Sequence, residues 1–398
     1  MRLCCITNLY PSRSRPYYGS FVREFMWALT RQSVQCTVVC PETVFSMRHG
    51  KLDPYETLDR TDSGQVVRVL RPRYVSASAK QLPGFNTDVI SQFTFELAVR
   101  RTFVLLEHET DIIYGHFFYP AGRAAVQLGR AYGKPSVVRH GEGRLNARHL
   151  KRVAGDFADI SGVISNSRRL KRYCEQELGI PGERVRAFLN GVDRSIFYPR
   201  DRVSMRRKLR LPQDQFLVIF VGYFTELKGP HRVLKAIETL DGVSAVLVGA
   251  PQRPDHIELE SPRAVFVGAV EHSRLPEYMS AADAFVLPTT MEGCCNAILE
   301  AMACGIPVVS SNGDFNDEII DDEVAIRVDP EDTDQIRQAI LTLKESPGLR
   351  ERLSKTCLIR SRQFDINTRA REVAEWLGEI VARNGGRARQ CGSAPEGA

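Results

Sequence analysis

The 398-residue chain is predicted to be an α/β protein with two domains of similar size. In both halves, short apolar runs alternate with amphipathic runs of helix length, which is the pattern of parallel α/β folding. A turn at Asn190–Asp193 and a basic stretch at Arg200–Arg210, where we place the linker, separate the halves. We therefore expect one domain over 1–195, a second over 196–365 and a cleft between them. A Gly/Arg/Ala-rich tail without regular structure follows over 385–398.

The first half is predicted to begin with a strand at Arg2–Thr7 and a helix that starts near Ser20. Phe21, Phe25 and Leu29 recur every four residues and so share one face of that helix. No regular pattern covers 43–95, and we assign no elements there. Further strands are expected at Gln35–Cys40, Asp111–Tyr114, Ser136–Arg139 and Gly162–Ser165.

The second half has clearer boundaries. Phe216–Val221 is continuously apolar, as in a strand buried on both faces. Helices are expected from Pro230, from about Arg274 with Ser273 as N-cap, and from Asn296 to Cys304. The remaining strands are expected at Ala245–Val248, Ala264–Val267, Ala284–Leu287 and Pro307–Ser310. In open α/β sheets, ligands bind at the carboxyl ends of the strands, so we searched the loops after each strand for chemistry.

Composition excludes several classes of protein. No apolar run approaches the roughly 18–20 residues of a membrane span, and the N-terminus does not fit a signal peptide. The ten cysteines form no CxxC motif and no Cys/His cluster at zinc spacing. We expect reduced thiols, a cytoplasmic location and no metal site.

Charge is distributed unequally between the halves. Residues 1–200 carry 30 Lys and Arg against 18 Asp and Glu, a net of +12, whereas residues 201–398 carry 24 against 30, a net of −6. The first half could therefore meet an anionic acceptor or an acidic membrane surface. The alternative is that its arginines only solvate helix faces. The acidic second half opposes a nucleic-acid partner, and we expect none.

The strongest candidate site is the segment from Glu292 to Glu300. Glu292 lies in the loop after a strand, Gly293 permits close backbone approach, and Asn296 can cap the following helix. The first turn of that helix presents free N–H groups and a positive dipole end, which suit a diphosphate. Glu300, one turn further on, could accept hydrogen bonds from ribose hydroxyls. The alternative is an ordinary capped helix with two surface glutamates.

This segment resembles the E-x7-E signature of the retaining glycosyltransferases of family 4, and the resemblance covers about residues 1–380. Those enzymes have the GT-B fold, in which two Rossmann-like domains face each other across a cleft. Four other segments resemble family motifs in the expected order: Ile164–Ser167, Asn190–Asp193 with Phe197 and Pro199, Phe220–Gly229, and Leu275–Asp283 with Pro288.

The resemblance implies a role for particular residues of the second domain. Glu292 corresponds to the glutamate that touches the donor sugar, Glu300 to the one that holds the ribose, and Lys228 to the diphosphate lysine. Where the family commonly has Arg after Val-Gly, this chain has Tyr223, which brings no charge. The other residues assigned to donor binding are Gly222, Gly249, Gly293, Cys294, Cys295 and Asn296.

In the first domain, the resemblance points to a donor contact and to acceptor contacts. His140 matches a histidine that contacts the donor sugar, and Gly19 matches a loop glycine near the donor phosphates or the acceptor. The alternatives are a structural histidine and an ordinary turn glycine. The acceptor-side candidates are Arg13, Arg15, His116 and Glu142.

The implied activity is transfer of a sugar from a nucleoside-diphosphate-sugar to an acceptor hydroxyl, with retention, without a metal and without a cofactor. The acceptor would be a glycan, a small molecule or a lipid-linked molecule, with peripheral membrane contact through the basic half. A helix over 366–384 would cross back to the first domain. Two alternatives remain: a non-catalytic partner subunit of the same fold, which Tyr223 favours, and a sugar-nucleotide hydrolase or epimerase.

Overall fold

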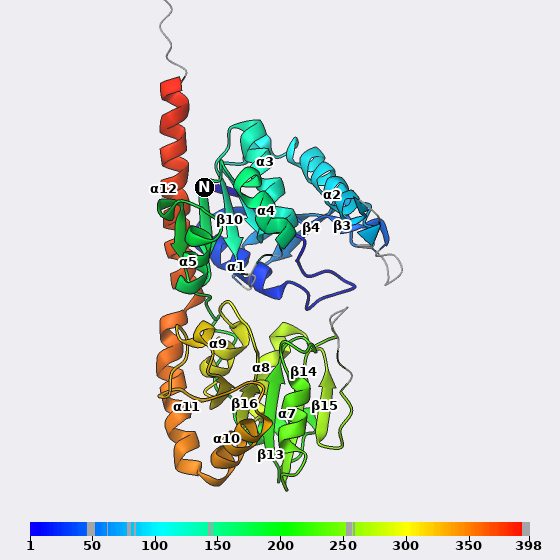
Figure 1. The fold of residues 1–398 in the computed structure, drawn as a ribbon, viewed down its shortest axis with the longest axis vertical. Coiled ribbons are helices and arrows are strands. Elements are labelled where there is room, and N and C mark those ends of the chain that lie inside the picture. Colours follow the sequence, from blue (N-terminus) through cyan, green and yellow to red (C-terminus); the bar gives the residue numbers. More distant parts are fainter. Residues whose placement is uncertain are drawn as a thin grey trace, which may run out of the picture. The chain divides into compact units, whose positions relative to one another are not determined.

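The computed structural model describes residues 1–45, 52–61, 63–77, 81–82, 85–141, 145, 147–251, 257 and 259–391 (Figure 1). The chain forms two compact units. The first unit contains Met1–Phe188 and Asn367–Ala398, and the second contains Leu189–Ile366. From the sequence, we expected divisions after 195 and 365. None of the described helices is long and apolar enough to cross a membrane.

The first unit is built on an eight-stranded sheet that is parallel except at one edge, where β4 runs antiparallel to β5. The first strand pairs on both sides, since Leu3 lies opposite Cys36 on one neighbour and Ile112 on the other. The order across the sheet is β12 (Val185–Ala187), β11 (Gly162–Ser165), β10 (Ser136–His140), β9 (Ile112–His116), β1 (Arg2–Ile6), β2 (Gln35–Val39), β5 (Val66–Leu70) and β4 (Glu56–Arg60).

Successive apolar side chains of these strands point to opposite faces of the sheet. Helices therefore cover both faces. On one face, Cys4 and Ile6 pack with α2 (Asp88–Phe103) and α3 (Arg123–Tyr132). On the other face, Tyr114 meets Phe25 of α1 (Ser20–Arg31). The remaining helices of the first 188 residues are α4 (Ala147–Asp156) and α5 (Arg168–Gln176).

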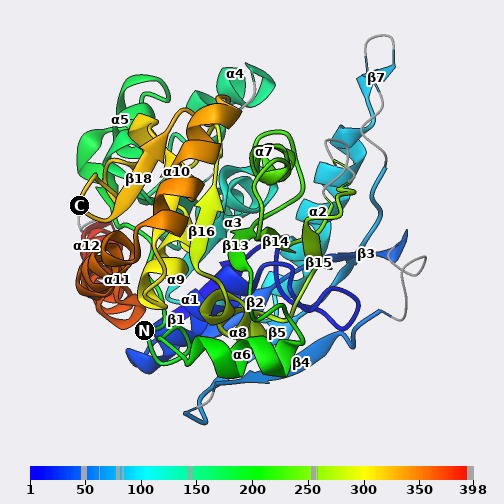
Figure 2. The same cartoon turned by 90° about the horizontal axis from the view of Figure 1, so that it is seen from below.

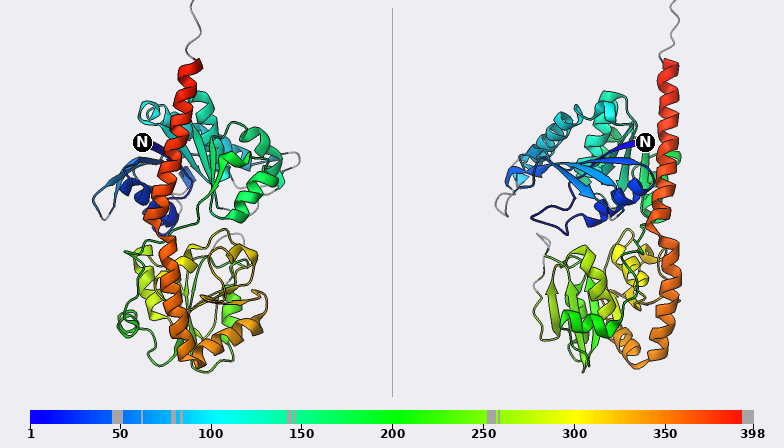
Figure 3. Two further views of the ribbon diagram at one scale, coloured as in Figure 1. Left: turned by 90° about the vertical axis from the view of Figure 1, so that its left-hand side faces the viewer. Right: turned by 180° about the vertical axis from the view of Figure 1, so that it is seen from behind.

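The C-terminal helix α12 (Ile366–Cys391) contributes to the core of the first unit (Figure 3). The ring of Trp376 lies 5.8 Å from that of Phe188, and Trp376 and Ile380 fill the space above Gly162. The helix extends to Cys391, whereas an irregular tail was expected from 385. The rest of that expected tail, 392–398, lies outside the described residues.

The second unit has a six-stranded, fully parallel sheet. Its central strand is apolar at every position, so both of its faces are buried. The strand order is β15 (Ala264–Gly268), β14 (Val243–Val248), β13 (Phe216–Val221), β16 (Ala284–Leu287), β17 (Val308–Ser311) and β18 (Ala325–Val328).

Helices lie on both faces of the second sheet (Figure 2). One face carries α7 (Pro230–Ile237) and α10 (Thr333–Glu345). The other face carries α8 (Leu275–Ala281) and α9 (Asn296–Ala303), backed by α6 (Arg202–Leu209) and α11 (Pro347–Ser361). The expected order of strands and helices in this half is confirmed.

Two local expectations were wrong, and one region left unassigned contains regular structure. The basic stretch taken as a linker contains α6, because Asp201 caps that helix and buried Arg206 pairs with Asp283. Ser273 is not the cap of α8, since a 3-10 turn precedes that helix. The unassigned region 43–95 holds β4, β5, the start of α2 and short strands at β3 (Glu42–Thr43), β6 (Arg73–Tyr74), β7 (Gln81–Leu82) and β8 (Phe85–Asn86).

Candidate active site

The loops after β13 and β14 touch through two of the predicted glycines. The Gly222 N–H donates to the Val248 carbonyl at 3.0 Å, which aligns the two strand ends. A Cβ added at Gly249 would lie only 1.8 Å from the carbonyl oxygen of Gly222. Glycine is therefore required at position 249 by the close approach of two backbones.

The loops after β13 and β16 are also joined, and they bring Lys228 to Glu292. The Thr290 N–H donates to the Leu227 carbonyl at 2.9 Å, and the Lys228 ammonium donates to the Glu292 carboxylate. Burial opposes the charge on Lys228, but the neighbouring groups, Glu292 first among them, together outweigh it, so the pKa of Lys228 is raised. The structure thus holds a charged lysine against one of the two predicted glutamates.

Helix α9 begins at Asn296, three residues after Gly293. Its N-cap is Cys295, whose side chain makes no capping hydrogen bond. Asn296 was expected to cap the helix, but it is the first helical residue and accepts a hydrogen bond from the Asn190 amide at 2.7 Å. The first-turn N–H groups of a helix have no partners within the helix, so this end can bind an anion.

The two adjacent cysteines at this helix start are structural. Cys294 and Cys295 are both buried, and burial raises the pKa of Cys295 well above its ordinary value. A neutral buried thiol is a poor nucleophile. The Asn190 amide also donates to the Cys294 carbonyl at 2.8 Å, so the junction segment holds this loop in place.

Glu300 lies inside α9, one turn beyond its start, and is almost fully buried. Its carboxylate is 3.2 Å from Nε2 of His272, which lies in the turn before α8. The His272 ring packs edge-on against Phe197, with ring centroids 5.1 Å apart. His272 therefore orients the Glu300 carboxylate, and Phe197 packs against the ring of His272.

Tyr223 follows Gly222 at the start of the loop after β13. It lies close enough to Lys228 to contribute to the raised pKa of the lysine. It supplies a phenol where a guanidinium was expected from the resemblance. Among the predicted donor residues, the structure thus brings together Lys228, Glu292 and the start of α9, with Tyr223 beside them.

In the first unit, two predicted histidines end neighbouring strands. His116 is buried at the end of β9, where its Nε2 lies 2.8 Å from the Arg139 guanidinium. His140 is buried at the end of β10 between the rings of Phe118 and Tyr173, and neither of its ring nitrogens has a hydrogen-bond partner among the described residues. Burial, reinforced by nearby Arg139, lowers the pKa of both, that of His140 to about 3. Both imidazoles are neutral at pH 7.

The loop before α1 carries the other first-unit candidates. Gly19 is required for a local reason, because it has a φ of 78° and a Cβ there would lie 2.5 Å from the backbone of Leu9. Arg13 and Arg15 are exposed, and Arg15 lies over the Tyr18 ring. Glu142 lies outside the described residues.

No group of three His, Cys, Asp or Glu side chains in the described ranges is arranged to hold a metal ion. Sequence analysis overlooked an Asp-x-Asp triplet at Asp332–Asp334. Both carboxylates are used locally there, since Asp332 caps α10 and Asp334 pairs with Arg337.

Two contacts that shape this site were not predicted from the sequence, that of Asn190 with the start of α9 and that of His272 with Glu300. The Asn-Gly-Val-Asp motif was visible, but its contact with a loop more than a hundred residues away was not. His272 carried no local signal, because its role depends on where α8 and α9 pack.

Two parallel α/β units, each with polar residues at the carboxyl ends of its strands, define the GT-B class of two Rossmann-like domains. The family model of "Glycosyl transferases group 1" matches residues 201–357, and that of "Glycosyltransferase Family 4" matches residues 19–196. The chain belongs to the family 4-like, GT-B glycosyltransferases.

Named relatives agree with this assignment. The chain is 28% identical over 336 residues to a putative teichuronic acid biosynthesis glycosyltransferase of Bacillus subtilis, covering 78% of this chain and 81% of that one. It is 27% identical over 376 residues to a D-inositol 3-phosphate glycosyltransferase of Xylanimonas cellulosilytica, covering 89% and 86%.

Solved structures share the fold. Sucrose-phosphate synthase from Thermosynechococcus elongatus has a TM-score of 0.78 at 19% identity, over 96% of this chain and 99% of that one. Anabaena HepE in complex with UDP and glucose has a TM-score of 0.70 at 19% identity, over 95% and 99%.

Proposed function

We propose that this glycosyltransferase moves a sugar from a nucleoside-diphosphate-sugar to an acceptor hydroxyl, with retention of the anomeric configuration and without a metal. The observation that carries the proposal is a charged lysine beside a helix start without a side-chain cap, which is a binding site for a diphosphate. The complexes of Anabaena HepE with UDP and with UDP-glucose support such a donor.

We assign three side chains to different parts of the donor. The first-turn N–H groups of α9 bind the diphosphate together with Lys228. Glu300 accepts hydrogen bonds from the ribose hydroxyls, and His272 keeps its carboxylate in position. Glu292 accepts from hydroxyls of the donor sugar while it shares Lys228 with the phosphate.

In the transfer step, the bond from the anomeric carbon to the diphosphate breaks, the acceptor oxygen bonds to the same carbon, and the proton of the acceptor hydroxyl passes to the departing diphosphate. Negative charge builds on the leaving diphosphate. A fixed ammonium and a helix N-terminus stabilise that charge more strongly than they stabilise the bound donor. Because Tyr223 is uncharged, Lys228 is the cationic side chain to which we assign this role.

The first unit is proposed to bind the acceptor through the exposed Arg13 and Arg15, whereas His116 and His140 are buried within this unit. Its net positive charge suits an anionic or lipid-linked acceptor at a membrane surface.

The proposal is tested by titrating the chain with UDP, GDP and ADP and by measuring sugar transfer. Lys228→Ala should reduce the transfer rate by about 10²–10³ and affect nucleotide binding less. Lys208→Ala is the matched control, because Lys208 also pairs with a glutamate of the second unit but lies on α6. Equal effects of the two variants, or a parent without transfer to any acceptor, would overturn the catalytic assignment.

Metal independence is tested separately, by exhaustive treatment with EDTA. We expect full transfer activity after chelation, because lysine and a helix terminus supply the positive charge that a metal would bring. Activity that disappears with EDTA and returns with Mn²⁺ or Mg²⁺ would contradict this part of the proposal.

A further inference from the structure

Helix α2 carries large apolar side chains on its exposed face as well as on its buried face. Phe95, Val99 and Phe103 are buried in the core of the first unit. Of the exposed large apolar side chains in the described residues, six lie on this helix or the turn after it: Val89, Ile90, Phe93, Leu97, Val104 and Leu105. Phe93 is 64% exposed and Leu105 is 72% exposed.

These side chains form one continuous surface, which we call the α2 face. Positions 89, 93, 97, 100 and 104 follow one another at intervals of three or four residues and so lie on the same side of the helix. The charged residues of this face are Arg100 and Arg101, which are both exposed. No ion pair of either arginine is found in the part of the chain that the structure describes, and the acidic Glu96 is turned toward Arg123. The α2 face is therefore apolar and positive.

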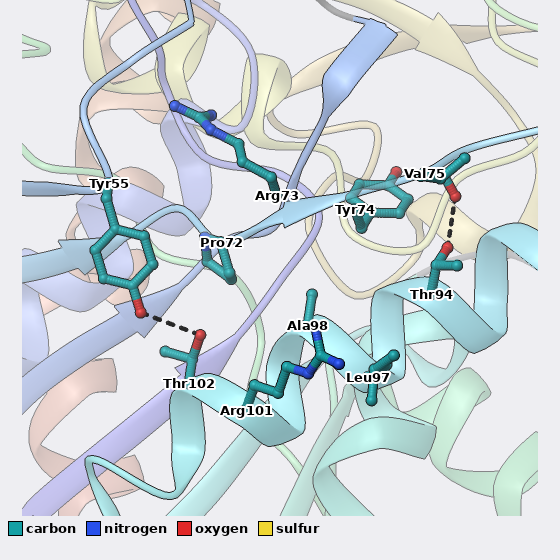
Figure 4. A pocket seen from close by; sticks show the side chains of 10 residues that line it. All are labelled: Tyr55, Pro72, Arg73, Tyr74, Val75, Thr94, Leu97, Ala98, Arg101 and Thr102. Atoms are coloured by element: carbon teal, nitrogen blue, oxygen red, sulfur yellow. Dashed lines mark hydrogen bonds between the residues drawn. The ribbon is translucent and has the colours of Figure 1, made fainter.

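A groove lies beside this face (Figure 4). One wall is the chain from Pro72 to Val75, the other is α2 from Thr94 to Thr102, and Tyr55 lies at one end. Its volume is about 370 Å³, which is enough for a phosphate-bearing head group. Arg73 is already held by Glu42, whereas Arg101 lines the groove without such a partner among the described side chains.

We propose that the α2 face docks onto an anionic lipid bilayer, with the phosphate of one lipid in the groove beside Arg101. Apolar side chains of a helix enter the boundary between head groups and acyl chains, and arginines on the same face meet the lipid phosphates. Two arginines and no exposed acid on one face disfavour a second copy of this chain, because a twofold contact would bring like charges together. The inference deepens the proposed function by naming the surface that would bring the enzyme to a lipid-linked acceptor.

The test is co-sedimentation of the full chain with phosphatidylcholine vesicles, with and without phosphatidylglycerol. The parent should bind the anionic vesicles more tightly than the neutral ones. Phe93→Asp should weaken binding at least about tenfold, because it removes apolar insertion and adds repulsion. Ile359→Asp is the matched control, since Ile359 is 63% exposed on α11, and it should leave binding unchanged.

Substitutions of Arg100 and Arg101 test whether a lipid phosphate binds in the groove. Arg101→Gln should cost about fivefold or more in binding to anionic vesicles, and Arg100→Gln less, because only Arg101 lines the groove. Equal costs would overturn the placement of the phosphate. The double variant Arg168→Gln/Arg172→Gln removes two charges from α5 of the same unit. If this variant lost vesicle binding while the α2 variants kept it, the assignment to α2 would be overturned.

Two further measurements separate this inference from the proposed function. UDP titration of the Phe93→Asp variant without vesicles should match the parent, because the substitution lies in the first unit. A parent that binds no vesicles overturns docking and leaves sugar transfer to be decided by the Lys228 variant. A Phe93→Asp variant that loses a dimer in light scattering, rather than vesicle binding, would show that the face joins two copies.

Discussion

Glu292, in the loop before α9, and Glu300, inside α9, are both carboxylates, and we propose different tasks for them because their partners differ. Glu292 is held by a lysine and Glu300 by a histidine. A cationic partner prepares Glu292 to share Lys228 with an incoming phosphate. The histidine partner of Glu300 orients its carboxylate, which we propose as an acceptor for hydroxyl groups. The identity of each neighbour, rather than the glutamate itself, separates the two roles.

Replacing Glu300 tests its role in holding the ribose. Glu300→Gln keeps the shape but loses charge-assisted acceptance, so nucleotide binding should weaken by about 1.5–3 kcal/mol. Isothermal titration with the free nucleoside diphosphate measures the effect. Glu277→Gln, which removes a carboxylate of α8 that pairs with Lys208, is the control. Unchanged affinity in the Glu300 variant would rule out the ribose assignment.

His140 makes the stability of the first unit depend on pH. Its pKa is about 3 in the folded chain, against about 6.5 when unfolded. The contribution of the neutral, buried His140 to the free energy of unfolding is therefore fully present above pH 6.5. It is lost as pH falls toward 3, because only the unfolded chain takes up the proton. Between pH 6.5 and 4.5, the free energy of unfolding should fall by about 2–3 kcal/mol for this reason.

Thermal unfolding measured across this pH range tests the effect. The His140→Asn variant should show a shallower fall in melting temperature than the parent, since it lacks the buried imidazole. The exposed His108→Asn is the control and should follow the parent. A variant with the same slope as the parent would mean that His140 titrates normally in the folded chain.

At the scale of elements, the loops after β13, β14 and β16 build the proposed donor site because they end neighbouring parallel strands. Each strand in such a sheet places its carboxyl end at the same edge. Helix α9 then starts at that edge, and the Asn190 segment fixes its first residues. The alternation of strands and helices was predictable from apolar runs. The Asn190 contact was not, because it joins residues distant in sequence.

The close approach of two of these loops predicts the effect of Gly249→Ala. A Cβ there would meet the backbone of Gly222, which cannot move aside as a side chain can. We expect a loss of about 1–3 kcal/mol in stability, together with weaker nucleotide binding, measured by denaturation and titration. Gly378→Ala, in α12 with open space around it, should instead stabilise by about 0.5–1 kcal/mol. A neutral Gly249→Ala would refute the close packing of the loops.

At the scale of the whole molecule, the first unit is made from both ends of the chain. Residues up to Phe188 supply the sheet, and α12 packs Trp376 against Gly162 and Phe188. The second unit is a single continuous segment. Changes in α12 should therefore act on the first unit and spare the donor site of the second.

Trp376→Ala tests this division. Removing a buried indole should destabilise the first unit by about 3–5 kcal/mol, seen as an earlier thermal transition. Nucleotide affinity, measured below that transition, should remain near that of the parent. Ile359→Ala, at an exposed position of α11, should change stability by no more than about 0.5 kcal/mol. A shift below 1 kcal/mol for Trp376→Ala would contradict the anchoring role of α12.

The sequence by itself determined the α/β class and the central strands of both sheets, and it singled out the segment from Glu292 to Glu300. It could do so because apolar periodicity and the spacing from Glu292 to Glu300 are local properties of the chain. No elements could be assigned from the sequence in region 43–95, because its strands are short or lie at an edge and because α2 is apolar on both faces.

Only the tertiary structure decided which side chains meet. It paired Lys228 with Glu292 and His272 with Glu300, moved the cap of α9 from Asn296 to Cys295, and left the arginines of the α2 face without ion pairs among the described residues. Each of these depends on the packing of elements far apart in sequence. Side-chain partners follow from that packing, and no local pattern in the chain records it.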